Sequence, residues 1–369
     1  MRKVISRLQL FRDQLRRKVG VWLFDKSKAK IESNHQQWQS DKIKHIVFVR
    51  TDAKLGDAFV SSFVFSAIKR FNRDIQITVV ASPNMASLFT DHLGADRVVM
   101  LEKRPKYSDI RKACQEIGQC DLVVSLSLNM KMKDIYFLRC CQASHVAGLD
   151  DELKLIDLKL GSATKGKHFA EKFMYLLDKI GIKPVETHYV IPQTKESRQT
   201  AQDFIHDHKL RRYCVINAFG SGNARKLTGE SIKKISQSIS RHDPDIKVVL
   251  VSSPETKLLA DQYIKQFDID ALHYNVSRSI FDISSVINFA EFVVSVDTAT
   301  VHMTTGLSRP QLAFYHDDKE NFSQWHPNSD LALTSIAKST SVPDINSLDW
   351  EDVNSKIAHL VTKAKDPTQ

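Results

Sequence analysis

The sequence of 369 residues lacks long apolar runs, and it contains little glycine or proline. No apolar stretch approaches the roughly 20 residues that a helix needs to cross a bilayer. The first eight residues, MRKVISRL, have neither the apolar core nor the cleavage site of a secretory signal. Only 12 Gly and 10 Pro exclude a collagen-like or low-complexity chain. We therefore expect a soluble, cytoplasmic protein, and the length is typical of two domains.

Cysteine is also scarce, and its spacing excludes the usual metal and disulfide frameworks. The five residues are Cys114, Cys120, Cys140, Cys141 and Cys214, an odd number without paired metal-ligand spacing. We expect them to be reduced. The adjacent pair could be reactive or simply packed, and the sequence leaves both interpretations open. Because no paired carboxylate or Cys/His cluster is visible either, no metal site is expected.

The net charge of +10 comes mostly from the N-terminus. Residues 1–44 contain 12 Lys or Arg against 4 Asp or Glu, whereas the other 325 residues contain 41 against 39. Within this basic segment one apolar stripe has helical spacing. It consists of Val4, Leu8, Phe11, Leu15, Val19 and Trp22. Such a helix suits an anionic membrane surface through residues 1–30, or it packs on the body with its charges solvated. The nearly neutral body argues against nucleic acid as a partner.

From residue 44 onward, short apolar runs alternate with amphipathic stretches. The expected strands of the first half are His45–Arg50, Ile77–Ala81, Arg97–Leu101, Leu122–Leu126 and His145–Gly148. Helical patterns separate them at Asp57–Phe71, Met85–Leu93, Ser108–Ile117 and Lys133–Ala143, and another follows at Lys167–Ile180. Alternation of this kind predicts a parallel sheet with helices on both faces.

The alternation restarts near residue 213. Strands are expected at Tyr213–Phe219, Val248–Ser252, Leu272–Tyr274, Phe292–Val296 and Leu312–Tyr315, and a last helix at Trp350–Ala364. The fold class is therefore α/β, with two facing Rossmann-like domains and a basic N-terminal helical extension. The expected divisions are an extension (1–43), an N-terminal domain (44–190), a linker (191–211), a C-terminal domain (212–335) and a helical tail (336–369).

The first polar junction, Arg50 to Asp57, directly follows a predicted strand and opens a helix. It lacks the three glycines of a dinucleotide fingerprint and the Gly-Lys-Ser/Thr ending of a P-loop. Near a helix N-terminus, Asp57 is favoured in its ionised form. The residue either caps the helix or accepts a proton from an attacking hydroxyl. The sequence cannot separate these two roles.

A second junction contains Gly220, Ser221 and Gly222, followed by Arg225 and Lys226. Small residues let backbone N–H groups approach an anion closely, and the two cations add charge. The segment predicts either a diphosphate site or a solvated loop.

The third junction, Asp297-Thr-Ala-Thr-Val-His302, also follows an apolar strand. Thr298 and Thr300 offer hydroxyls, Asp297 could accept from a sugar, and His302 is one turn further on. A histidine in a packed helix is more often structural. Three junctions at the carboxyl ends of strands together favour a ligand site.

In this order, the three motifs resemble the lipopolysaccharide heptosyltransferases, a glycosyltransferase family (family 9) with the GT-B fold. They are Arg-x-Asp-x-x-x-Gly-Asp (Arg50 to Asp57), Gly-Ser-Gly-x-x-x-Lys (Gly220 to Lys226) and Asp-Thr-x-x-x-His (Asp297 to His302). The resemblance covers about residues 44–335. It implies transfer of a heptose from ADP-heptose to the inner core of lipopolysaccharide, with Kdo or heptose as acceptor.

The resemblance also assigns roles to individual residues. Asp57 matches the general base, and Ser221, Gly222 and Lys226 match the loop and lysine that contact the diphosphate. Asp297, Thr298 and His302 match positions near the phosphates and sugar of the donor. Glu255 is a looser match to a carboxylate for the ribose. Ala299 stands where the family usually has glycine, and its methyl group would crowd a phosphate if the backbone there needed a positive φ or a very close approach.

The mechanism that follows is a single displacement that inverts the anomeric centre, with Asp57 as base and no metal or other cofactor. The acceptor would be a lipid-linked oligosaccharide at the inner face of the inner membrane, with the enzyme bound peripherally. Basic residues of the N-terminal domain are candidates for binding it: Arg50, Lys54, Arg104, Lys131 and Arg139.

Two alternatives remain at this point. The chain could run another GT-B reaction, such as hexosamine transfer or epimerisation of a sugar nucleotide. It could also be a non-catalytic GT-B-like binding protein in which Ala299 spoils the donor site.

Overall fold

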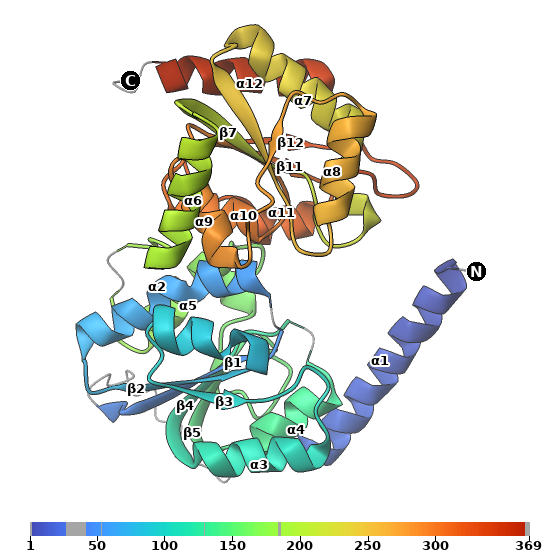
Figure 1. The fold of residues 1–369 in the computed structure, drawn as a ribbon. Coiled ribbons are helices and arrows are strands. Elements are labelled where there is room, and N and C mark those ends of the chain that lie inside the picture. The colour runs from blue at the N-terminus through green and yellow to red at the C-terminus, as the bar shows by residue number, and fades with distance from the viewer. Residues whose placement is uncertain (1, 27–41, 53, 129, 184–185, 366–369) are drawn as a thin grey trace. The chain divides into compact units, whose positions relative to one another are not determined.

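The computed structural model describes residues 2–26, 42–52, 54–128, 130–183 and 186–365, and the side chains from residue 11 onward (Figure 1). The chain forms two compact units. The first contains Met1–Lys54 and Ser61–Thr187, and the second contains His188–Gln369 together with the short segment Leu55–Val60. This division falls between residues 187 and 188.

The first unit is built on one six-stranded parallel sheet. Its strands are β1 (His45–Arg50), β2 (Gln76–Ala81), β3 (Arg97–Met100), β4 (Gln119–Ser125), β5 (Gln142–Gly148) and β6 (Leu158–Lys159). Their order in space is β3-β2-β1-β4-β5-β6, which is the Rossmann order with its switch point between β1 and β4. The strands are short and rich in buried Val and Ile, as central parallel strands are. The predicted parallel sheet is confirmed, and the two-residue β6 is an addition.

Helices connect these strands from the carboxyl edge of the sheet back to its amino edge. They are α2 (Leu55–Phe71), α3 (Tyr107–Ile117), α4 (Met132–Cys140) and α5 (Phe169–Lys179), preceded by α1 (Arg2–Phe24). The helix expected at 85–93 is instead a 3₁₀ turn at Pro83–Met85 followed by a π turn at Leu88–His92. Gly94, with φ of +87°, follows this segment in the left-handed region where helices commonly end.

The second unit repeats the same design. Its strands are β7 (Arg212–Asn217), β8 (Ile246–Val251), β9 (Leu272–His273), β10 (Val293–Val296), β11 (Gln311–Tyr315) and β12 (Ala332–Ile336). Its helices are α6 (Lys195–Asp207), α7 (Gly229–His242), α8 (Lys257–Gln266), α9 (Ile280–Asn288), α10 (Ala299–Gly306), α11 (Lys319–Trp325) and α12 (Trp350–Lys365). The order β12-β11-β10-β7-β8-β9 again places one switch point, here between β7 and β10. β12 lies outside the predicted strands.

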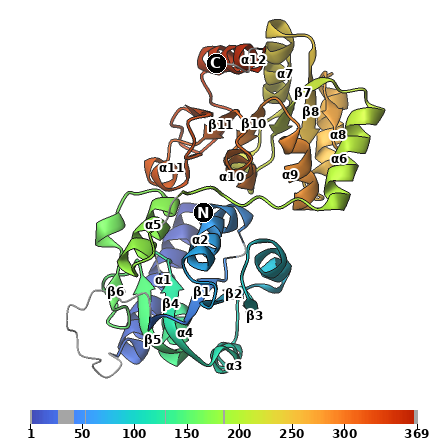
Figure 2. The same cartoon turned by 90° about the vertical axis from the view of Figure 1, so that its left-hand side faces the viewer.

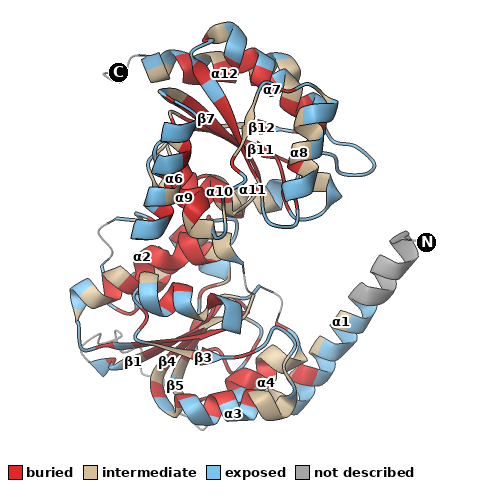
Figure 3. Cartoon of the chain, in the orientation of Figure 1, coloured by how far each residue is buried: buried red, intermediate tan, exposed pale blue. Residues whose placement is uncertain are grey.

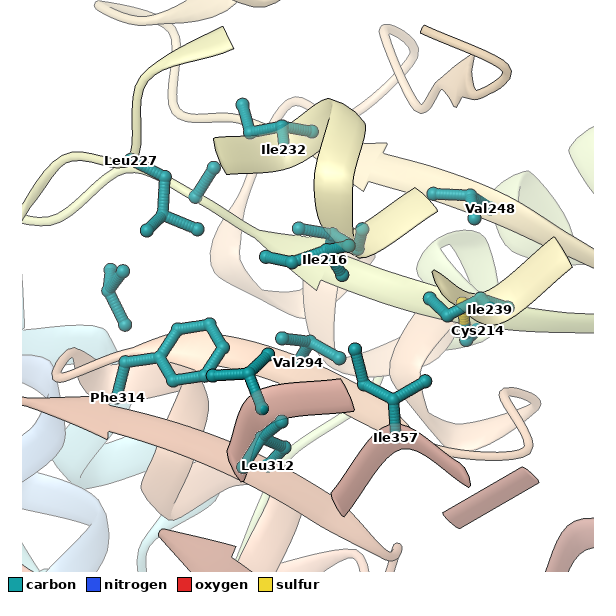
Figure 4. Packing of buried hydrophobic residues seen from close by; sticks show 14 of the residues in the cluster. Cys214, Ile216, Leu227, Ile232, Ile239, Val248, Val294, Leu312, Phe314 and Ile357 are labelled. Atoms are coloured by element: carbon teal, nitrogen blue, oxygen red, sulfur yellow. The ribbon is translucent and has the colours of Figure 1, made fainter. Parts of the chain in front are cut away.

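The core of the second unit fills one face of this sheet. Ile216 of β7, Val294 of β10 and Leu312 of β11 are fully buried and point toward Ile239 of α7 and Ile357 of α12 (Figure 4). The same cluster contains Cys214, which burial protects because it raises the pKa of its thiol.

Two helices lie outside the range predicted for the C-terminal domain. α6, in the segment expected to be a linker, packs beside α9 (Figure 2), where Ser197 Oγ lies 2.8 Å from Ser285 Oγ. α12, in the expected tail, packs on α7 and contributes Val353, Ile357 and Leu360 to the core. Both helices therefore belong to the folded second unit.

The core cluster gives the first prediction. Ile216→Ala should lower the free energy of unfolding of the second unit by about 2–5 kcal/mol, because it leaves a cavity among rigid neighbours. The matched control is Leu258→Ala, which removes an equally large side chain that is 82% exposed and should change it by less than about 0.5 kcal/mol. Chemical unfolding of both variants measures the difference. Equal shifts would show that this cluster does not hold the unit together.

Candidate functional site

The carboxyl edge of the second sheet gathers the polar residues of two predicted motifs. In an open parallel sheet, ligands bind outside the carboxyl ends of the strands at the switch point, here between β7 and β10. The loop after β7 contains the second motif, and the turn after β10 contains the third. The structure therefore brings Ser221, Gly222 and Lys226 to the same edge as Asp297, Thr298 and His302.

Glycines shape the loop after β7. The Gly220 N–H donates to the Arg225 carbonyl at 2.8 Å, and a Cβ on Gly220 would lie 2.7 Å from that same oxygen. Gly222 has φ of +83°, in the left-handed region that favours glycine. Phe219 and Lys226 pair across the base of the loop. The loop is thus a closed turn whose shape requires both small residues.

This loop presents donors and a cation. Ser221 and Gly222 are exposed, and within the described residues their N–H groups donate no hydrogen bond. The Lys226 ammonium likewise makes no ion pair with any residue that the structure describes. Uncommitted backbone donors beside a cation are the components of an anion site.

An asparagine that the motifs did not include ties the two strands together at the switch point. The Asn217 amide nitrogen, at the end of β7, lies 2.7 Å from Thr298 Oγ1 and 3.0 Å from Thr300 Oγ1. It also lies 3.2 Å from Ser295 Oγ in β10. These contacts fix the threonine hydroxyls at the start of α10. No signal in the sequence pointed to Asn217, because it lies inside the predicted strand Tyr213–Phe219 and ends only the observed β7.

Asp297 is buried and contacts one residue of the loop after β7 and one of α11. Arg225 Nη2 lies 3.2 Å from its carboxylate, and Asn321 of α11 donates to it at 3.1 Å. His316, which follows β11, lies nearby; burial and the Arg225 charge both lower its pKa. Asp297 therefore connects the loop after β7 to α11, and neither Asn321 nor His316 was predicted.

His302 is a buried, neutral histidine. Burial, with a smaller contribution from His326, lowers its pKa from 6.5 to about 4. Its Nδ1 is buried and has no hydrogen-bond partner among the described residues. The ring lies against Tyr189 and Trp325, with centroids 6.4 and 6.1 Å away. Near neutral pH the ring can donate or accept a hydrogen bond with a ligand, but it carries no positive charge. Any positive charge at this edge comes from Arg225 and Lys226.

Ala299 has ordinary helical geometry. It is the first residue of α10, after the N-cap Thr298, whose hydroxyl accepts from the Thr300 N–H at 3.3 Å. It is not among the residues with positive φ. The methyl group is therefore compatible with this backbone, and alanine is a good residue for a helix start.

The start of α2 belongs to the second unit and lies beside α10. A Cβ on Gly56 would lie 3.1 Å from His302 Cδ2 and 3.4 Å from Ala299 Cα. Asp57, the next residue, is the third residue of α2, and the N-cap position is Lys54. Asp57 is partly exposed. The end of the first motif, Gly56 and Asp57, therefore lies in the same unit as the third motif.

Glu255 lies on the same edge, in the exposed turn between β8 and α8. A chain of hydrogen bonds holds the start of this turn. Asp261 Oδ1 lies 2.7 Å from His273 Nδ1, and His273 Nε2 lies 2.9 Å from Ser252 Oγ. The carboxylate of Glu255 thus lies on a fixed turn but remains exposed.

The five basic residues of the first unit do not form one group. Arg50, Lys54, Arg104 and Lys131 follow or precede elements at the carboxyl edge of the first sheet, whereas Arg139 ends α4 at the opposite edge. Arg50 donates to Ser61 Oγ at 2.6 Å. Lys131 pairs with Asp13 of α1 at 3.0 Å, and Arg139 reaches the Lys26 carbonyl. Lys131 and Arg139 therefore contact the N-terminal segment.

Across the described ranges, no group of three or more His, Cys, Asp or Glu side chains is placed to hold a metal ion. That the reaction proceeds without a metal stays a prediction.

The neutral ring of His302 gives the second prediction. The unfolded chain binds a proton at this ring near pH 6.5 and the folded chain only near pH 4, so the free energy of unfolding falls as pH drops through that window. The full effect is about 3 kcal/mol. His302→Gln should remove this part of the pH dependence, measured by chemical unfolding at about pH 7 and about pH 5.

NMR titration checks the same point without relying on the variant's stability. The His302 ring signal, assigned by its loss in His302→Gln, should shift between about pH 7 and pH 5 by only about a tenth of its full titration change. A ring that titrates near 6.5 would contradict the buried, neutral state.

Comparison with known proteins places this site in a family. The model of glycosyltransferase family 9 (heptosyltransferase) matches residues 110–350, more than half of the chain. "Putative lipopolysaccharide heptosyltransferase 4" of Escherichia coli (strain K12) is 22% identical over 338 residues, which are 89% of this chain and 90% of that protein.

Solved structures show the same fold. A family 9 glycosyltransferase from Veillonella parvula has a TM-score of 0.70 at 15% identity, covering 89% of this chain and 100% of its own. E. coli heptosyltransferase WaaC with ADP has a TM-score of 0.62 at 18% identity, covering 86% and 99%. The likeness confirms the predicted GT-B class of two Rossmann-like units. The chain belongs to glycosyltransferase family 9, the heptosyltransferases.

Proposed function

We propose that the chain transfers a heptose from ADP-heptose to the inner core of lipopolysaccharide, with inversion at the anomeric carbon. The observation that carries this proposal is the switch point of the second sheet. There an anion-binding loop with Lys226, the threonine hydroxyls held by Asn217 and the start of α10 lie on one edge. WaaC, a member of similar fold, has been solved with ADP and with ADP-2-deoxy-2-fluoro heptose.

The diphosphate of the donor would bind between the loop after β7 and the N-terminus of α10. The N–H groups of Ser221 and Gly222, the Lys226 ammonium and the positive end of the helix all favour an anion. The same groups stabilise the additional charge of ADP as it leaves. Glu255, on its fixed turn, would accept from the ribose hydroxyls, and Asp297 and His302 would contact the sugar or phosphates.

Asp57 would take the proton from the acceptor hydroxyl. A carboxylate in the first turn of a helix is favoured in its ionised, proton-accepting form. The close approach of Gly56 to His302 and Ala299 supports the placement of this base next to the donor groups. Attack by the hydroxyl forms the new glycosidic bond while the bond to the ADP oxygen breaks. No step in this scheme uses a metal.

The acceptor would be a lipid-linked oligosaccharide that ends in Kdo or heptose, and the enzyme would work peripherally at the cytoplasmic face of the inner membrane. Arg50, Lys54 and Arg104, on the carboxyl edge of the first sheet, would contact its acidic groups. Lys131 and Arg139 are weaker candidates because both contact the N-terminal segment.

The third prediction separates the base from the donor site. Asp57→Asn should lower kcat by about 10²–10⁴-fold and leave ADP affinity nearly unchanged, because the base acts on the acceptor. Lys226→Ala should weaken ADP binding by about tenfold or more, because a charge-assisted contact is lost. Calorimetry with ADP and single-turnover assays with ADP-heptose measure both effects.

Matched controls are Asp203→Asn and Lys195→Ala, exposed residues of α6 that should change neither quantity. Near-normal turnover of Asp57→Asn would show that another group is the base. A larger thermal shift with UDP or GDP than with ADP would show a different donor. The mass spectrum of lipopolysaccharide core from cells lacking the chain identifies the sugar and the acceptor.

A further inference from the structure

One face of α1 is docked on the first unit. Arg17 Nη2 lies 2.9 Å from Asp150 Oδ1 and 3.0 Å from Glu152 Oε2. Directly after the helix, the buried Asp25 carboxylate accepts from the backbone N–H groups of Lys154 and Leu155, at 3.0 and 2.9 Å. These partners are more than 120 residues away in sequence, so α1 is attached to the fold itself.

The same face also packs on α4. A Cβ on Gly20 would lie 2.7 Å from Met132 Cα, so the two backbones approach as closely as glycine allows. Val21 and Phe24 pack against the core of the first unit, and the Phe24 ring lies 4.9 Å from the Tyr136 ring. Together with the Arg17 and Asp25 contacts, this packing fixes the rotation of α1 about its axis.

The opposite face of α1 is exposed: Figure 3 colours much of this helix as exposed, and large apolar residues are among the exposed ones. Phe11, Leu15, Val19 and Trp22 are 67, 53, 38 and 77% exposed. At about 100° per residue they form one stripe, roughly opposite to Arg17, Gly20 and Phe24. Val4 and Leu8, the other members of the predicted stripe, lie outside the residues whose side chains are described. The docked face is therefore not the apolar stripe.

This row differs from the other exposed apolar residues of the molecule. Met100, Leu258 and Val342 are similarly exposed, but they occur singly on separate elements, as is normal for a protein surface. Four aligned residues, two of them aromatic, form a contiguous patch that indicates a binding surface.

The charges around the stripe identify its partner as anionic. Arg12, Arg16 and Lys18 are exposed beside it. The two acidic residues of the described helix and its end, Asp13 and Asp25, are both engaged by the first unit. No described helix is long and apolar enough to span a membrane. An apolar stripe with basic flanks then suits the headgroup region of an anionic leaflet. A second copy fits less well, because stripe-to-stripe pairing would bring like charges together.

We infer that α1 is a preoriented membrane arm. Its exposed stripe lies at the boundary between headgroups and acyl chains of an anionic bilayer, with Arg12, Arg16 and Lys18 on the lipid phosphates. The docked face transmits that orientation to the first unit, so the carboxyl edge of its sheet takes a fixed direction relative to the bilayer. The membrane contact then lies on one face of one helix, and membrane binding requires neither the sugar donor nor the acceptor.

Flotation of the full-length protein with vesicles of phosphatidylethanolamine and phosphatidylglycerol tests it. The combined variant Phe11→Gln, Leu15→Gln, Trp22→Gln should bind at least about tenfold more weakly, since each large side chain contributes when buried. The matched control is Met100→Gln, Leu258→Gln, Val342→Gln, which removes equally exposed side chains elsewhere and should float like the wild type. Glutamine keeps the helix propensity high.

A second variant tests the charges. Arg12→Gln, Arg16→Gln, Lys18→Gln should lose binding to these vesicles to a similar extent, and the wild type should bind phosphatidylcholine vesicles weakly. Normal flotation of the apolar variant would overturn the inference. A second result would also overturn the inference: the wild type is a dimer that does not bind vesicles, and the apolar variant is a monomer. A second copy of the chain would then occupy the stripe. Flotation without ADP-heptose keeps this result separate from failure of the proposed sugar transfer.

Discussion

The arrangement of the candidate site depends on a property of parallel sheets: the carboxyl ends of all strands lie at the same edge. In the second unit β7 and β10 are neighbours, although almost 80 residues separate them in sequence. Asn217 fixes the positions of these neighbouring strand ends. Its amide nitrogen lies within hydrogen-bond distance of Ser295 Oγ before the turn after β10 and of the Thr298 and Thr300 hydroxyls after it. The loop after β7, Asp297 and the start of α10 are all positioned by that pairing.

The sequence was sufficient for the strands and the three junctions because both leave local signals. Buried parallel strands are runs of Val, Ile and Phe, and polar turns must follow them. The short β6 and the final β12 were missed because neither is a pronounced apolar run: Leu158–Lys159 is two residues long, and Ala332–Ile336 is mostly half-buried. Asn217, Asn321 and His316 were missed because their partners lie on other strands or loops, and no local spacing announces such contacts.

Charge within the candidate site is distributed differently from what residue types alone indicate. A histidine beside a phosphate site invites the assumption that it is cationic, yet burial holds His302 neutral near physiological pH. Arg225 is partly committed to Asp297. Lys226 is consequently the cation most available to a diphosphate, while His302, with its unpaired Nδ1, retains hydrogen-bonding capacity for a ligand. Positive charge and hydrogen bonding are thereby divided between different side chains.

The N-terminal helix shows why periodicity alone does not determine how a helix docks. The longest apolar stripe of a helix normally packs on the body. Here the opposite face does so instead, through the polar contacts of Arg17 and Asp25 and the packing of Phe24. Exposure of the Phe11 and Trp22 side chains to water is unfavourable in free energy, because it leaves large apolar surfaces hydrated. Insertion of the stripe into an anionic bilayer, as inferred above, would remove that cost and pair the basic flanks with lipid phosphates. The family model begins only at residue 110, so this arm is a property of the chain beyond the matched region.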